Sequence, residues 1–280
     1  MNYEMNLANF NLTFGSEKQP MLDYFDDLVY TAFIKSTKYK SYIYKKNRIS
    51  YQFTNIKKEQ TEFGAFLTGF LYRTSSKSHL LDNWGWSMFC IRLKDHKLAY
   101  IKNNWQSPSL KIFNSATNHI LRVYKNNVNK YKRLNFELNI IGLPDYKALE
   151  GKIRNAKKVN EITLSFFYLN GEDNPFLGNI DSSLGKKIQS TIKKSEAEQF
   201  NLNVKNPNKP DVFFNSFKSL KCKAGIAINY ISSFGNKKIV KNNDVLEKLP
   251  LKRLILSPYR YPYRYNDNLF NEINEKLKNI

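Results

Sequence analysis

The sequence predicts an α+β protein with an antiparallel or mixed central sheet. Two observations indicate this class. Runs of aromatic and β-branched residues, each of strand length, follow one another through the amino-terminal part of the chain. From about residue 107 onward, apolar residues spaced three or four apart, which is typical of helices, separate the strand-like runs. We therefore expect an amino-terminal meander of strands with one helix and a carboxyl-terminal half in which strands and helices alternate.

The amino-terminal elements can be placed from their patterns. Alternation over residues 5–14 (MNLANFNLTF) predicts a strand with one buried face. A helix is expected over about residues 20–36, because Pro20 suits a first turn, aspartates follow it and lysines lie at the far end. An antiparallel meander should follow, with strands at 48–56, 62–74, 86–93 and 97–102.

The carboxyl-terminal half begins with a helix of about five turns from Ser109, because apolar residues recur at helical spacing as far as Val128. Pro144 should open a second helix, and Asp267 should cap a last one. The nearly continuous apolar run 161–169 predicts a strand buried on both faces. The remaining expected elements are strands at 133–141, 200–204, 224–231 and 251–257 and a helix through Ile180, Leu184, Ile188 and Ile192.

A chain of 280 residues can form one large domain or two modest ones. The change from strand-like to helical spacing suggests a boundary between residues 104 and 108, which gives segments 1–106 and 107–280 unless the two form one continuous domain. An amino end without a basic and then a hydrophobic region, and a chain without an apolar run of about 20 residues, predict a cytoplasmic protein. Cys90 and Cys222 lack the CxxC spacing of zinc and redox sites, so both are expected to be ordinary buried or half-buried thiols.

Net charge is the strongest global signal. The chain has 45 Lys and Arg against 24 Asp and Glu, which gives +21. Such a charge attracts polyanions over long range, so nucleic acid is the leading partner class. The plain alternative is a lysine-rich composition that serves solubility alone. An anionic membrane surface is the weaker alternative, because each amphipathic helix is needed to cover the core.

The histidines and the one segment that resembles a phosphate-binding loop are better explained by structural roles than by catalysis. His79, His96 and His119 lie outside any recognisable catalytic motif, and His96 in a polar turn is expected to be a surface imidazole. The stretch GNIDSSLGKKIQST resembles a phosphate-binding loop, but its glycines are too far apart and Lys187 stands where Ser or Thr should bind magnesium. We therefore expect no catalytic residue, metal or cofactor.

A metal-dependent nuclease is the enzyme alternative that stays open. Pro144, Asp145, Glu150 and Lys152 resemble the PD…ExK signature of restriction-type nucleases, whose carboxylates hold a metal ion. In that family the ExK part usually lies on a strand farther from the aspartate, whereas both parts lie on one predicted helix here. Helix capping by Pro144 and Asp145 is therefore the better interpretation.

Basic clusters recur between the elements and are the candidate nucleic-acid-binding residues, because lysines and arginines on one face can neutralise phosphates. These candidates are Lys45, Lys46, Arg48, Lys152, Arg154, Lys157, Lys158, Lys186, Lys187, Lys193, Lys194, Lys237 and Lys238. Whether they share a face is not encoded in their spacing.

Two segments interleave aromatic and basic residues, which favours a single-stranded target, because bases stack on tyrosine rings while cations bind the backbone. One is residues 39–53 (YKSYIYKKNRISYQF), and the other is residues 257–268 (SPYRYPYRYNDN). In an extended chain the second segment would place a tyrosine row opposite an arginine row, so we add Tyr259, Arg260, Tyr261, Tyr263 and Arg264 to the candidates. Packing of those tyrosines against the sheet is an equally good alternative.

The general character of the chain, rich in lysine, asparagine and tyrosine with an antiparallel amino half, is similar to that of accessory proteins of bacterial anti-phage systems of the abortive-infection type. The resemblance carries no diagnostic motif. It implies that a phage nucleic acid or a phage protein is the target. Three hypotheses follow: a non-enzymatic nucleic-acid-binding protein of low sequence specificity, a nuclease with an unrecognised carboxylate site, and a module that binds an acidic partner, including a phage protein that mimics DNA. A protein partner from the same operon is also expected.

Overall fold

The computed structural model of the chain describes residues 3–14, 23–47, 49–74, 85–132, 136–167, 187, 190, 191, 199–218, 224–251, 268–278 and 280. The chain divides into two compact units. Unit 1 comprises Met1–Phe10, Pro20–Ile140 and Lys248–Ile280, and unit 2 comprises Asn11–Gln19 and Ile141–Glu247. The division does not coincide with the boundary suggested at residues 104–108, because the strand before that point and the helix after it pack together inside unit 1.

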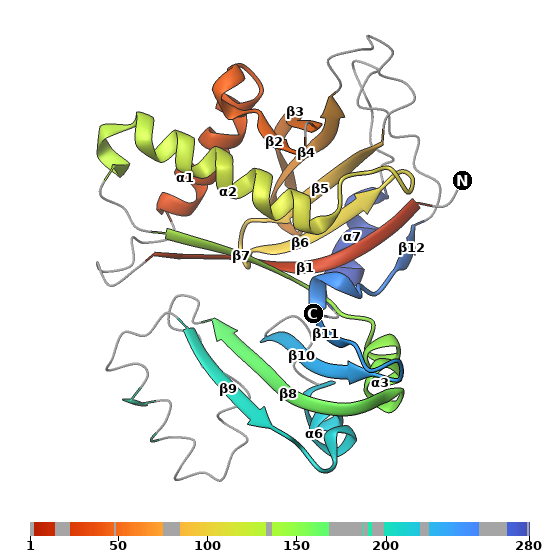
Figure 1. The fold of residues 1–280 in the computed structure, drawn as a ribbon. Helices are drawn as coiled ribbons and strands as arrows, with labels where there is room; N and C mark the ends of the chain where they lie inside the picture. Colours follow the sequence, from red (N-terminus) through yellow and green to blue (C-terminus); the bar gives the residue numbers. More distant parts are fainter. Residues whose placement is uncertain are drawn as a thin grey trace. The chain divides into compact units, whose positions relative to one another are not determined.

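Unit 1 is built on a sheet in the spatial order β12-β1-β6-β5-β4-β3-β2, in which β7 also pairs with β1 (Figure 1). The strands are β1 (Tyr3–Phe14), β2 (Tyr44–Lys46), β3 (Ile49–Thr61), β4 (Gly64–Thr74), β5 (Trp86–Arg92), β6 (Lys97–Lys102), β7 (Phe136–Gly142) and β12 (Leu249–Leu251). The pairs along the stated order are antiparallel. The predicted class and the meander from β3 to β6 are therefore confirmed.

Strand β1 is inserted between β6 and β12, and this position changes its burial. The alternating pattern predicts one buried face, but Asn6 and Asn11 are buried as well as Leu7 and Phe10. That prediction is wrong because residues of both parities are buried along β1 of a sheet that has helices on both of its faces.

Two helices cover one face of this sheet (Figure 1). They are α1 (Asp23–Ser36) and α2 (Leu110–Asn127), and Ser109 caps α2 by accepting a hydrogen bond from the backbone N–H of Ile112. Phe113 of α2 packs against Phe53 and Phe89 of the sheet, with ring centroids 5.9 and 5.1 Å away. Phe33 of α1 joins the same cluster at 4.8 Å from Phe53. Such aromatic packing holds both helices on the sheet.

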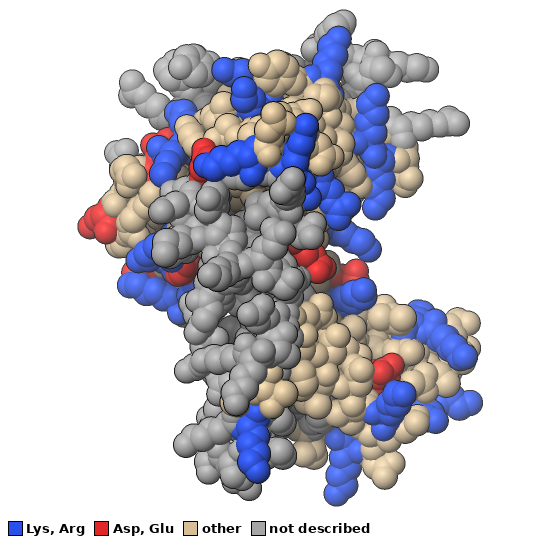
Figure 2. Space-filling view, turned by 90° about the vertical axis from the view of Figure 1, so that its left-hand side faces the viewer, with Lys and Arg blue, Asp and Glu red and all other residues tan. Residues whose placement is uncertain are grey.

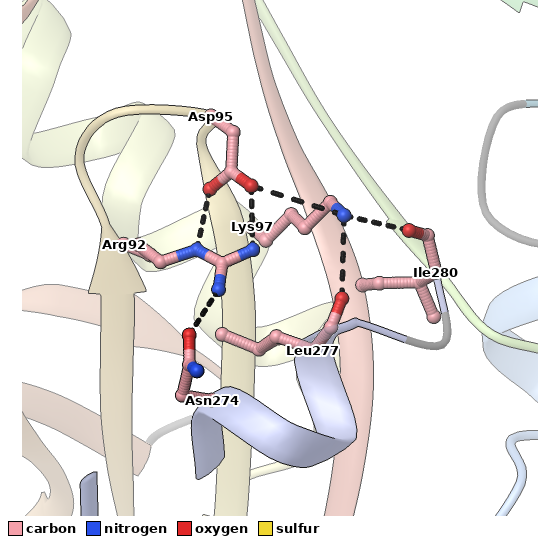
Figure 3. Close-up of polar contacts among 6 residues, drawn as sticks. All are labelled: Arg92, Asp95, Lys97, Asn274, Leu277 and Ile280. Carbon is pink, nitrogen blue, oxygen red and sulfur yellow. Dashed lines mark hydrogen bonds and ion pairs between the residues drawn. The ribbon is translucent and has the colours of Figure 1, made fainter. Parts of the chain in front are cut away.

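Helix α7 (Leu269–Leu277) lies on the opposite face, because its partners on β5 have the opposite parity to Phe89. Arg92 anchors it (Figure 3): Nη1 donates to Asn274 Oδ1 at 2.5 Å, while Nε and Nη2 donate to the two carboxylate oxygens of Asp95. Lys97 Nζ donates to the carbonyl oxygens of Leu277 and Ile280. Unit 1 thus has three layers, helix, sheet and helix.

Unit 2 contains an antiparallel sheet in the order β11-β10-β8-β9. The strands are β8 (Ala156–Phe167), β9 (Gln199–Lys205), β10 (Ala224–Ser232) and β11 (Lys237–Lys241), and the helices are α3 (Tyr146–Arg154) and α6 (Pro210–Phe217). Leu149 of α3 and Phe214 of α6 join a core with inward residues of the strands, such as Ile162 and Ile228. The alternating burial of β10 indicates that the opposite face of this sheet is less covered.

Several expected elements of unit 2 differ from the structure. Strand β8 begins at Ala156, five residues before the predicted start, and its burial alternates, so the prediction of two buried faces is wrong. The reason is that Thr163 and Ser165 point away from the helices. Pro144 forms an isolated bridge with Leu246 and does not open α3, whose N-cap is Asp145. The sequence patterns also missed β11 and α6.

Candidate nucleic-acid interface

A group of tyrosines gathers at one end of the helical layer of unit 1. The short 3-10 helix Lys40–Tyr42 follows α1 and packs beside the carboxyl end of α2. Tyr39 contacts Tyr42, and both line a pocket with Tyr124 of α2, while Tyr44 of β2 contacts Tyr51 of β3 and His119 of α2. We call the set the tyrosine surface: Tyr39, Tyr42, Tyr44, Tyr51, Tyr124 and His119. Tyr39 has 51% of its surface exposed, whereas Tyr42 and Tyr124 are buried at the base.

The aromatic side chains continue from the short helix across the sheet edge. His119 Nε2 lies 3.2 Å from the carbonyl oxygen of Ser41, and because a carbonyl only accepts, Nε2 carries the proton and donates it. The His119 ring is 6.0 Å from Tyr44, which is 6.1 Å from its cross-strand partner Tyr51. Arg73 on β4 stands opposite Tyr51 and completes the row.

The phenols of Tyr42, Tyr51 and Tyr124 are neutral at physiological pH, because their pKa values are raised. Burial raises the pKa of Tyr42, and a hydrogen bond with Asn127 only partly offsets that rise. Burial also raises the pKa of Tyr51 and of Tyr124, against smaller opposing effects of Arg73 and of Thr31. Neutral rings present π-faces without a negative charge that would repel phosphates.

Exposed lysines surround the tyrosine surface. Lys35 Nζ lies 5.7 Å from the centre of the Tyr39 ring, within the range of a cation–π contact. The other exposed lysines along residues 38–46 are Lys38, Lys40, Lys45 and Lys46. The nearby carboxylate of Asp27 lies 3.9 Å from Lys130 Nζ, which partly neutralises it. The candidates Lys45 and Lys46 are exposed on β2, the strand that carries Tyr44, and Figure 2 shows basic side chains over much of the visible face of unit 1.

A second basic group forms in unit 2, at the end of the sheet where β8 begins and the β10–β11 hairpin turns. Ile231 pairs with Lys158 on one side and with Lys237 on the other, so the two lysines share a face of the sheet about 10 Å apart. Lys157 and Lys238 are exposed next to them. The structure thus brings Lys158 and Lys237, which are widely separated in sequence, onto one face, while Lys157 and Lys238 have the opposite strand parity.

The hairpin turn carries an exposed aromatic ring that the sequence patterns missed. Phe234 has 87% of its surface exposed. The turn is held by hydrogen bonds from Gly235 N to Ser232 O and from Ser232 N to Asn236 O, and Gly235 has φ +81°, a conformation that favours glycine. A phenylalanine before a glycine in the polar run SSFGN is the sequence signal for this feature.

The residues that resemble a nuclease motif have structural partners. Asp145 Oδ1 accepts the backbone N–H of Ala148 and caps α3, as the helix interpretation predicts. Glu150 binds Lys218 and Arg154, at 3.0 and 2.5 Å, and the hydrogen bond from Lys218 lowers its pKa. Arg154 and Lys152 lie on α3, which covers the core face of the sheet, so they do not share the face of Lys158 and Lys237. Within the described ranges, no three His, Cys, Asp or Glu side chains converge as metal ligands.

Of the remaining candidates, the structure describes only Lys187. Lys187 is helical and exposed. Outside the described residues lie Arg48, Lys186, Lys193, Lys194, Tyr259, Arg260, Tyr261, Tyr263 and Arg264, as well as Asp267 and Cys222. Base stacking by the tyrosines of residues 257–267 and their packing against the sheet therefore both stay predictions.

Two further residues can be compared with their expectations. Cys90 is buried on β5, as expected, and burial raises the pKa of its thiol well above the usual range. His96 is 7% exposed, so the expectation of a surface imidazole is wrong. The turn that contains His96 lies against β1, because the backbone N–H of Phe10 donates a hydrogen bond to the carbonyl oxygen of His96.

No protein-family model matches the chain, and no curated protein or solved structure is significantly similar to it. In the part of the chain that the structure describes, none of the helices has both the length and the apolar character needed to cross a bilayer.

Proposed function

We propose that this protein is a non-enzymatic nucleic-acid-binding protein that prefers single strands, of DNA or of RNA. The observation that carries the proposal is the tyrosine surface with its exposed lysines. Single strands bind to surfaces on which bases stack on aromatic rings while cations contact the phosphates. Lys45 and Lys46 beside Tyr44, and Lys35 beside Tyr39, supply both kinds of group within one unit.

Low sequence specificity follows from the same chemistry. Lysine contacts with phosphates carry no base information, and every base has a π-face that can stack on tyrosine. The net charge of +21 adds a long-range attraction that falls with salt. The basic end of the sheet in unit 2, with Lys158 and Lys237, is a second place where a phosphate chain can bind.

The cellular setting is a proposal that rests on sequence alone. A cytoplasmic location would give the protein access to nucleic acid, and a part in anti-phage defence is supported by the general resemblance in composition. A protein partner from the same operon would fit that setting.

The test compares two pairs of lysine variants of the full chain. Lys45→Ala with Lys46→Ala should shallow the slope of log affinity against log salt by up to about 1.4, because each phosphate contact to a single strand contributes about 0.7. Lys94→Ala with Lys111→Ala is the control, since both residues are exposed lysines of unit 1 on other elements. Equal slopes for the two pairs would show that Lys45 and Lys46 do not contact the phosphates.

The same samples separate the proposal from its alternatives. Binding is measured by fluorescence anisotropy with magnesium present, and the oligonucleotide is then examined on a gel. Intact oligonucleotide agrees with a binding protein, whereas cleavage that Glu150→Gln abolishes would establish the nuclease. Binding to an acidic protein in the absence of any binding to oligonucleotides would establish the protein-interaction module instead.

A further inference from the structure

A pocket of about 250 Å³ opens within the tyrosine surface. It lies between the carboxyl ends of α1 and α2 and the short helix Lys40–Tyr42. Its lining residues are Lys35, Tyr39, Ser41, Tyr42, Tyr124, Asn127 and Val128. Three aromatic rings, one amide, one hydroxyl and one cation therefore line a single small cavity.

The aromatic part of the lining is buried at its base and exposed at its rim. Tyr42 and Tyr124 are buried, and their hydroxyls are engaged by Asn127 and by Thr31. Tyr39 stands half exposed with its ring centre 6.3 Å from that of Tyr42, at an interplanar angle of 38°. A flat ring that enters the pocket can thus stack on Tyr39 without displacing a core side chain.

The polar part of the lining matches the edge and the charge of a nucleotide. A side-chain amide has two N–H donors and a carbonyl with two lone pairs, so its bond with Tyr42 leaves Asn127 further capacity for a base edge. Ser41 adds a hydroxyl at the rim. Lys35 lies at the mouth beside Tyr39, where its ammonium group can bind the phosphate that follows the base.

The size of the cavity limits the ligand. Pockets for drug-sized molecules are about 300–1,000 Å³, and this one is smaller, at about 250 Å³. We propose that the pocket receives one unstacked base of a single-stranded nucleic acid, with Tyr39 as the stacking ring, Asn127 as the reader of the base edge and Lys35 as the phosphate ligand. This inference rests on the proposed function and deepens it.

The proposal has a consequence for strand preference. A base that is paired and stacked in a duplex cannot enter the pocket unless it is first extruded, which costs free energy. Single strands offer unstacked bases without that cost. The pocket therefore accounts for preference for single strands, while the surrounding lysines provide affinity for any phosphate chain.

The test uses the full chain with Tyr39→Ala, Tyr39→Phe and Asn127→Ala, and with Trp105→Ala as the control, an exposed aromatic of unit 1 outside the pocket. Each variant is titrated with four homopolymeric single strands across a salt series. Tyr39→Ala should weaken binding about 5- to 140-fold without changing the salt slope, because it removes stacking and no charge. Tyr39→Phe should bind like the wild type, and Asn127→Ala should change the order of preference among the four bases.

The outcomes distinguish this inference from the proposed function. If the wild-type protein binds single strands but Tyr39→Ala and Asn127→Ala bind all four as tightly as it does, the pocket is not a base site, although the proposed function stands. If the wild-type protein binds no strand at low salt, the proposed function fails and the inference fails with it. Thermal unfolding of each variant establishes that it is folded, and Tyr39 is half exposed, so its replacement should leave the unfolding temperature nearly unchanged.

Discussion

Replacement of Arg92 by methionine should loosen helix α7 and lower the stability of unit 1. The arginine side chain is 5% exposed and joins two groups, the carboxylate of Asp95 and the amide of Asn274 (Figure 3). Methionine keeps most of the aliphatic volume but removes the charge and all donors. The change therefore tests the polar anchor and not the packing around it.

The magnitude follows from what the substitution leaves behind. Removal of one partner of a buried pair costs about 3–5 kcal/mol, because the other charge stays buried and uncompensated. Here the Asp95 side chain is 29% exposed and still has Lys97 Nζ at 3.8 Å, so the lower end, about 3 kcal/mol, applies. For a unit of this size, 1 kcal/mol corresponds to about 2–4 °C, so the unfolding temperature should fall by about 6–12 °C.

The assay combines thermal unfolding with hydrogen exchange. Amides of α7 in the Arg92→Met variant should exchange faster than in the wild type, since the helix loses its link to β5. Arg122→Ala is the control, because this arginine is exposed on α2 and bonds Asn118 of the same helix. An unfolding temperature within about 1 °C of the wild type, with unchanged exchange in α7, would refute the assignment of Arg92 as the anchor.

Two further predictions concern stability. Burial raises the pKa of Cys90 and of Tyr100 above their usual values of 9.0 and 10.0. The unfolded chain then loses these protons first as pH rises, so stability that is complete below about pH 9 should decrease above it by up to about 1.4 kcal/mol per pH unit for each group. Denaturant unfolding of Cys90→Ala and Tyr100→Phe checks this, and a variant as alkali-sensitive as the wild type would exclude the group replaced. Asp145→Ala should cost about 1 kcal/mol through loss of the α3 cap, while Asp145→Ser should retain most of it; equal unfolding midpoints for the two variants would contradict the capping role.

Much of the fold could be predicted because local patterns and tertiary structure agree there. The β3–β6 meander has aromatic and β-branched runs between polar turns, and the apolar stripe of α2 from Leu110 to Tyr124 is buried. Prediction failed where the position of an element in the sheet decides its burial. Asn6 and Asn11 give β1 a half-polar pattern, yet β1 is an inner strand with both faces covered.

The candidate site was predictable only in its local part. Residues 39–53 show the interleaved tyrosines and lysines that a strand-binding surface needs. The residues that complete the surface come from α1 and α2. In the sequence, Tyr124 cannot be distinguished from the other apolar positions of the α2 stripe, so its place in the surface could not be predicted. The same limit applies to Lys158 and Lys237, which only the pairing of β8 and β11 with β10 places on one face.

The most direct measurement of the central claim is the binding of the wild-type protein to labelled single-stranded RNA, single-stranded DNA and duplex DNA of one sequence, by fluorescence anisotropy from about 50 to 200 mM salt. The account predicts that single strands bind more tightly than the duplex, that affinity falls steeply with salt, and that the label stays on intact oligonucleotide. Absence of binding at the lowest salt, or equal affinity for all three at every salt concentration, would contradict it.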